Sequence, residues 1–146
     1  MNQYKGVHCI YDFVNICCDD LLLYQHQINA ILDKVIADSN LNQIDQSSQL
    51  FNGQNTPPGF ANVRVLDESH LSVHSYSEQG ILAADLFTCG STERGREAGA
   101  LFKQLVLAQF PSALLKHEYI LNRFPTHGQT ISCNNQTLSQ EMKYDT

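Results

Sequence analysis

The amino-acid sequence predicts an α+β fold, a two-layer sandwich with a mainly antiparallel sheet and two helices on one face. Two stretches repeat apolar residues three and four positions apart, which is the spacing of an amphipathic helix. Around them lie shorter stretches rich in β-branched and aromatic residues, joined by connections of hairpin length. At 146 residues, the chain has the length of one domain with a substantial core.

The first part of the chain predicts a strand, a helix and a long polar loop. Residues 5–14 form the strand, because they are rich in β-branched and aromatic side chains. Two aspartates at 19–20 open the helix, since acidic groups are favourable at a helix N-terminus, and the apolar spacing continues to about residue 38. Residues 40–60 are rich in Asn and Gln and predict a loop with one short strand near 50–51.

The remainder predicts further strands and a second helix. A turn at 75–80 joins two of the strands as a hairpin, and Pro111 ends the helix. Beyond a single domain of residues 1–122, the polar segment 123–146 predicts an irregular tail. The strands are expected at 61–67, 69–75, 80–88 and 113–121, and the helix at 92–109.

The composition excludes several classes of function. A net charge of −6 without any basic run disfavours nucleic acid and anionic membranes as partners. No apolar stretch approaches the roughly 20 residues of a membrane span, and the N-terminus lacks an apolar signal core. An odd number of cysteines, five, predicts reduced thiols in the cytoplasm. Neither Cys-x-x-Cys nor His-Glu-x-x-His occurs, so no metal site is predicted.

Reactive side chains are concentrated in residues 68–90. Glu68 precedes Ser69, His74 follows five residues later, and Cys89 ends an apolar run. A hairpin turn centred on 77–78 pairs residues whose numbers sum to about 155–157, so Cys89 faces positions 66–68. We therefore expect a serine–histidine–cysteine cluster at the Glu68–Ser69 bond. These are the parts needed by a chain that cuts itself and uses the new end as a cofactor.

Two motifs in this segment resemble those of a known family. Residues 68–74 read Glu-Ser-His-Leu-Ser-Val-His, and residues 85–90 read Asp-Leu-Phe-Thr-Cys-Gly. The prokaryotic S-adenosylmethionine decarboxylase proenzymes have Glu-Ser-His-x-x-x-His, then Trp-Pro-Glu, then Asp-x-Phe-x-Cys-Gly. Residues 6–8, Gly-Val-His, are similar to the family's Gly-x-His opening. The resemblance covers about residues 5–120 and is strongest over 68–90.

The resemblance implies a self-cleaving proenzyme. The hydroxyl of Ser69 would attack the carbonyl of Glu68 with proton transfer assisted by His74. Cleavage would yield a β chain of residues 1–68 and an α chain of residues 69–146 that begins with a pyruvoyl group derived from Ser69.

The same resemblance implies the reaction and the assembly. The pyruvoyl ketone would form a Schiff base with the substrate amine and accept electrons as carbon dioxide leaves. Cys89, with a thiol pKa near neutrality, would return a proton to the α-carbon. The implied substrate is S-adenosylmethionine, decarboxylated for spermidine synthesis, and the implied assembly is a homodimer of processed αβ units.

Three departures from the family pattern leave alternatives open. Ala61 replaces a serine that takes part in processing, the segment 52–59 lacks an aromatic ring that would lie near adenine, and residues 76–78 read Tyr-Ser-Glu. One alternative is the same chemistry on arginine or ornithine, with Asp85, Glu78 or Asp12 holding the cationic end. The other is an unprocessed, non-catalytic homologue that binds an active partner. The candidate substrate-binding residues are Phe51, Tyr76, Glu78 and Asp85.

Overall fold

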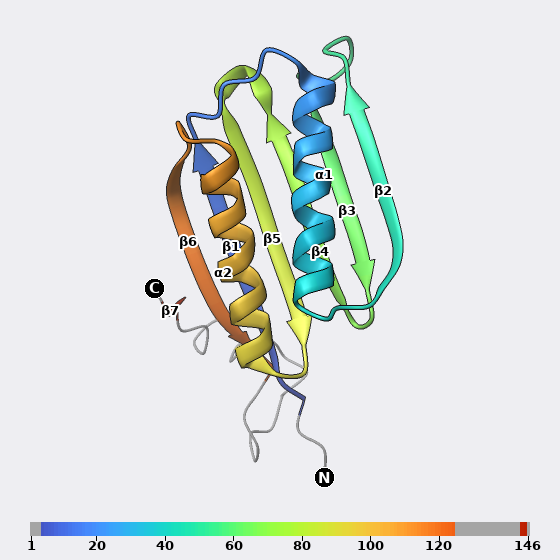
Figure 1. Cartoon of the computed structure of the whole chain (residues 1–146), viewed down its shortest axis with the longest axis vertical. Helices are drawn as coiled ribbons and strands as arrows, with labels where there is room; N and C mark the ends of the chain where they lie inside the picture. The colour runs from blue at the N-terminus through green and yellow to red at the C-terminus, as the bar shows by residue number, and fades with distance from the viewer. Residues whose placement is uncertain (1–3, 125–143, 146) are drawn as a thin grey trace, which may run out of the picture.

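The computed structural model describes residues 4–124 and 144–145. It has two layers, with both helices packed on the same face of one sheet (Figure 1). The strand order is β2-β3-β4-β5-β1-β6-β7, and every neighbouring pair is antiparallel. The predicted fold class is therefore confirmed. The elements are β1 (Gly6–Val14), α1 (Leu21–Asp38), β2 (Gln43–Phe51), β3 (Gly59–Leu66), β4 (Ser69–Tyr76), the 3-10 turn η1 (Ser77–Gln79), β5 (Ile81–Cys89), α2 (Thr92–Gln109), β6 (Leu114–Arg123) and β7 (Tyr144–Asp145).

Both helices begin at a capping side chain. The carboxylate of Asp20 accepts a hydrogen bond from the backbone N–H of Leu23, which satisfies one of the unpaired donors at the start of α1. Ser91 caps α2 in the same way, through the N–H of Arg94. In α2, Gly95 allows close packing, because a Cβ atom there would collide with Thr88 and Val7. This close contact fixes α2 against the end of β5 that carries Cys89.

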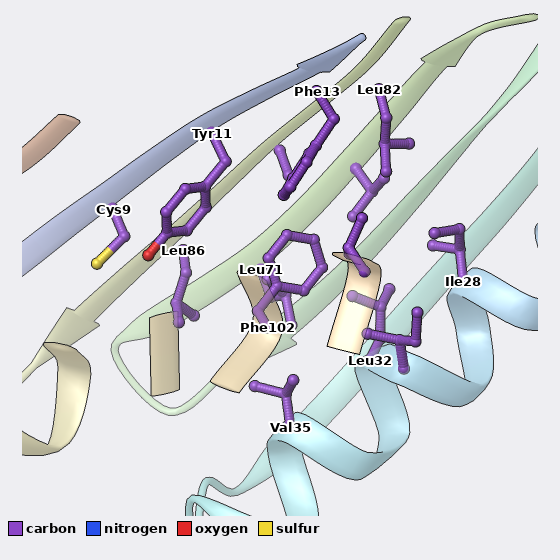
Figure 2. Packing of buried hydrophobic residues seen from close by; sticks show 14 of the residues in the cluster. Cys9, Tyr11, Phe13, Ile28, Leu32, Val35, Leu71, Leu82, Leu86 and Phe102 are labelled. Carbon is purple, nitrogen blue, oxygen red and sulfur yellow. The ribbon is translucent and has the colours of Figure 1, made fainter. Parts of the chain in front are cut away.

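The core lies between the helices and one face of the sheet (Figure 2). Phe102 of α2 packs against the rings of Tyr11 and Phe13, with ring centroids 6.0 and 6.2 Å apart. Side chains alternate along each strand, so the intervening residues point to the opposite face, which no described helix covers. We call this second surface the open face. Buried residues drawn in Figure 2 include Cys9, Tyr11, Phe13, Ile28, Leu32, Val35, Leu71, Leu82, Leu86 and Phe102.

The largest error in the sequence prediction concerns β2. Residues 40–60 were predicted as a loop with a short strand near 50–51, but β2 spans nine residues. It is an edge strand paired only with β3, and every residue except Phe51 is exposed. Because neither face of this strand is buried, its sequence lacks the alternation of polar and apolar residues that identifies a strand.

The boundary of the predicted tail also differs. Strand β6 continues to Arg123, one residue beyond the predicted domain end at 122, and the short β7 pairs with β6 at Ile120 and Leu121. The rest of the predicted tail, residues 125–143 and 146, lies outside the described residues.

Candidate active site

The Glu68–Ser69 bond lies in a two-residue hairpin turn. Leu66 ends β3 and pairs with Ser69, the first residue of β4, so Asp67 and Glu68 alone make the connection. Glu68 has a φ of 55°, in the left-handed region that non-glycine residues seldom adopt. The turn is at the lower end of the sheet in Figure 1, near the connection from α1 to β2.

The structure brings Ser69 and Cys89 together. The ladder between β4 and β5 pairs His70 with Phe87, and continuing it sets Cys89 beside Glu68. The backbone N–H of Cys89 donates a hydrogen bond to Ser69 Oγ at 3.1 Å. This agrees with the predicted hairpin register, in which Cys89 faces positions 66–68. We call Glu68, Ser69 and Cys89 the cleavage end.

The environment of Cys89 keeps its thiol protonated at neutral pH. Burial raises the pKa of this thiol, and the neighbouring Glu68 carboxylate raises it further, while the Arg123 guanidinium opposes both effects. The expectation of a near-neutral thiol pKa is therefore not supported in the uncleaved chain. Arg123 was missed in the sequence because it lies in the segment predicted as a tail.

His74 and three of the candidate substrate-binding residues lie toward the other end of β4. His74 is exposed and pairs with Ala61 on β3 and Ala83 on β5. Five residues of extended chain separate it from Ser69, about 16 Å, and the odd spacing points the two side chains to opposite faces. Phe51, Tyr76 and Glu78 lie at the end of β2, the end of β4 and in η1. We call His74, Phe51, Tyr76 and Glu78 the η1 end.

One chain therefore does not assemble the predicted serine–histidine–cysteine cluster. Ser69 and Cys89 are in contact, whereas His74 is far along the same strand. Strand periodicity alone would have indicated this, because residues five apart cannot share a face.

Asp85 is the centre of a second polar cluster, on the open face. Its Oδ2 atom accepts hydrogen bonds from Nε2 of His8 and Nε2 of His70, each at 2.7 Å, and Oδ1 accepts one from the hydroxyl of Ser72. Burial alone would raise the pKa of this carboxyl, but the hydrogen bonds from His8, Ser72 and His70 outweigh it and hold the pKa well below its usual range. Asp85 is thus a charged and already partnered carboxylate, which weakens its prediction as a carrier for a cationic substrate.

Arg123 determines how this cluster is protonated. Its Nη1 atom can only donate, and it lies 3.1 Å from Nδ1 of His8. Nδ1 is therefore the acceptor, and the Nε2 atom of the neutral ring carries the proton that it donates to Asp85. The ligand atoms of His8, His70 and Asp85 lie within 4.8 Å of one another, a spacing that a metal ion could bridge. In this structure the three groups form a hydrogen-bonded network.

Asp12 has a partner as well. Its carboxylate lies 3.1 Å from Nδ1 of His117, on the neighbouring strand β6. Two grooves, of about 500 and 370 Å³, run between α1 and α2. Neither is lined by a residue of the cleavage end or the η1 end.

Ser69 directly follows a tight hairpin turn, and its hydroxyl accepts a hydrogen bond from the backbone N–H of Cys89. The model of the S-adenosylmethionine decarboxylase family matches residues 7–112 of this chain. The chain therefore belongs to the S-adenosylmethionine decarboxylase family. The family is pyruvoyl-dependent, and its cofactor derives from a serine by self-cleavage. The predicted family, enzyme class and cofactor are confirmed.

Individual relatives agree with this assignment. The chain is 28% identical over 118 residues to an S-adenosylmethionine decarboxylase proenzyme of Archaeoglobus fulgidus, covering 81% of this chain and 96% of that protein. It is 32% identical over 93 residues to the proenzyme of Picrophilus torridus, covering 64% and 68% of the two chains. A crystal structure of the adenosylmethionine decarboxylase of Aquifex aeolicus has the same fold, with a TM-score of 0.64, 21% identity, and coverage of 90% of this chain and 100% of that one.

Among the described residues, no helix combines the length and the apolar character needed to cross a membrane.

Proposed function

We propose that this chain cleaves itself between Glu68 and Ser69 and then decarboxylates S-adenosylmethionine. The observation that carries the proposal is the placement of Ser69, whose Oγ accepts a hydrogen bond from the Cys89 N–H at the turn that would be cut. Ser69 fits a pyruvoyl precursor because its hydroxyl belongs to the residue immediately after the bond to be broken. The products are a β chain of residues 1–68 and an α chain of residues 69–146.

Cleavage begins with the addition of the Ser69 hydroxyl to the carbonyl carbon of Glu68. The C–N bond breaks, the nitrogen takes up a proton, and an ester joins Glu68 to Ser69 Oγ. Elimination then removes the proton from Cα of Ser69 and breaks the bond between Cβ and Oγ, so that a Cα–Cβ double bond forms and this oxygen leaves as part of the Glu68 carboxylate. Hydrolysis of the remaining enamine releases ammonia and leaves the ketone. The Cys89 N–H, which already points at Oγ, is placed to stabilise that oxygen as it gains negative charge.

When formed, the pyruvoyl group supplies an electron sink for loss of carbon dioxide from an amine substrate. Cys89 supplies the proton. The backbone of Cys89 is hydrogen-bonded to Ser69 Oγ, and the raised pKa of its thiol keeps that thiol in the protonated form that a donor requires.

A homodimer would complete the site. His74 and the candidate substrate-binding residues of the η1 end are too far from Ser69 to act within one chain. A two-fold axis running across the strands would lay the open faces of two copies together, so that the cleavage end of each meets the η1 end of the other. Both Asp67 and Glu68 are exposed, so the bond is accessible to a second copy. The partly exposed apolar residues of the open face suit such packing; they include Ile10, Val63, Val65, Ala83 and Phe87.

Denaturing gels and mass spectrometry test the cleavage. We expect the purified chain to give two fragments that separate after Glu68, and Ser69→Ala to give one intact chain. Borohydride trapping of labelled S-adenosylmethionine should mark only the larger fragment. A single uncut chain that releases no carbon dioxide from labelled S-adenosylmethionine would overturn the proposal. Release of carbon dioxide only from labelled arginine or ornithine would overturn the assignment of S-adenosylmethionine as the substrate.

A further inference from the structure

We propose that the turn at Asp67 and Glu68 is held under backbone strain by Asn42, and that release of this strain speeds self-cleavage. Asn42 is then a positioning residue for the reaction. The inference rests on the proposed cleavage after Glu68, and it adds a physical reason why this peptide bond, among all those of the chain, is the reactive one.

The strain is located at the residue whose carbonyl is attacked. The turn spans the four residues 66–69, of which Glu68 is the third, and Glu68 has a φ of 55°. A turn with positive φ at this position normally has glycine or asparagine there. In the left-handed conformation, the Cβ atom of any other residue crowds the carbonyl oxygen of the same residue. At Glu68, that carbonyl is the one that Ser69 would attack.

Asn42 prevents the turn from relaxing. Its side-chain Nδ2 donates to Oδ2 of Asp67 at 2.6 Å, and its backbone carbonyl accepts from the N–H of Asp67 at 3.0 Å. The segment that carries Asn42 is itself tied to the end of α1, because the N–H of Leu41 donates to the carbonyl of Ile36 at 3.0 Å. A strained conformation persists only when its surroundings hold it. Asn42 and the Cys89 N–H supply that support from the two sides of the turn.

Acyl transfer releases the strain. In the amide, one atom, the nitrogen, separates the Glu68 carbonyl carbon from the Ser69 Cα. In the ester, two atoms, Oγ and Cβ, separate them. The connection lengthens by one atom and loses its restricted peptide bond, so Glu68 can leave the left-handed region. The strain is present before the reaction and falls as the bond moves, which lowers the barrier.

A matched pair of variants tests the effect on rate. Glu68→Ala and Glu68→Gly both remove the side-chain carboxylate, but only alanine keeps a Cβ in the left-handed conformation. After cell-free synthesis, the alanine chain should be cut about 5- to 30-fold faster than the glycine chain, measured by timed gel samples. Asn42→Ala should slow cleavage when residue 68 is alanine and have little effect when it is glycine. Equal rates for the alanine and glycine chains would overturn the inference.

Stability in an uncleavable chain tests the strain itself. With Ser69→Ala present, Glu68→Gly should unfold at a higher urea concentration than Glu68→Ala. An equal or lower midpoint for the glycine chain would show that no strain is stored, whatever the cleavage rates. The two levels of failure are distinct. If the natural chain is never cut, the proposed function fails together with this inference. If it is cut and the paired variants do not differ, only the inference fails.

Discussion

The cleavage end and the η1 end of the sheet are built for different tasks. At the cleavage end, the Cys89 N–H donates to Ser69 Oγ and Asn42 donates to Asp67, so the turn between β3 and β4 is held on both sides. At the η1 end, His74 is exposed and Tyr76 remains 49% exposed. A group that must react with its own backbone needs a fixed geometry within one chain, whereas exposed side chains can contact a second molecule. The contrast supports the proposal that the scissile bond is positioned within one chain, whereas His74 and the rest of the η1 end act on a second copy.

Removing the thiol at the cleavage end should have the largest effect on turnover. Cys89→Ala keeps the backbone N–H that contacts Ser69 Oγ, so cleavage should continue. Release of carbon dioxide should fall about 10²- to 10⁴-fold, because the substrate α-carbon loses its proton donor. Cys17→Ala is a matched control, since this thiol is free and exposed. Unchanged turnover in Cys89→Ala would assign the proton to another group.

Mixing two uncut chains tests whether the η1 end acts on a second copy. We expect neither His74→Ala nor Ser69→Ala to be cleaved alone. Coexpressed with different tags, they should form mixed dimers in which the Ser69→Ala copy lends its His74 to the other chain. About half of the His74→Ala chains should then be cut, as random pairing predicts. No cleavage in the mixture, although mixed dimers are recovered, would place the action of His74 within its own chain.

A smaller gain is expected from restoring a hydroxyl next to His74. Ala61 pairs directly with His74 across β3 and β4, and it stands where the sequence resemblance implies a serine. Ala61→Ser should speed cleavage roughly 2- to 10-fold, the value of one hydrogen bond. Ala83→Ser places a hydroxyl on the other side of His74 and serves as the control. Equal acceleration by both variants would argue against a role specific to position 61.

The smallest effect is expected on the free energy of unfolding, from the Asp85 hydrogen-bond network that lies between the two ends. Asp85→Asn removes a carboxylate that accepts three hydrogen bonds and should lower the free energy of unfolding by about 1–3 kcal/mol at pH 7. The pKa of Asp85 is lowered in the folded chain, so its contribution is present above the ordinary aspartate pKa of about 4. The contribution is lost as the pH falls through the lower folded value. Urea unfolding should therefore show the difference between the two chains shrinking below about pH 4, and a constant difference would contradict this.

Local patterns predicted most of the fold but only part of the site. The strands buried on one face, such as β4 and β5, alternate clearly, and the capped helices match their predicted ranges closely. Strand β2 escaped prediction because it is exposed on both faces. The contact between Ser69 and Cys89 followed from the hairpin register. The contacts of His8 with Asp85 and Arg123 join residues that are 77 and 115 positions apart in the sequence. No local sequence pattern indicates a contact between residues so far apart.

The order of the strands has a consequence for the two chains that cleavage would create. Residues 1–68 contribute β1, β2 and β3, while β4, β5 and β6 come from the rest. In the sheet, β1 lies between β5 and β6, so a strand of the smaller chain is inserted into the larger one. The strands of the two fragments therefore alternate within one sheet, and neither fragment has a complete sheet of its own. A cut at one exposed turn would leave the domain intact, and reassembly from separated fragments would amount to folding it anew.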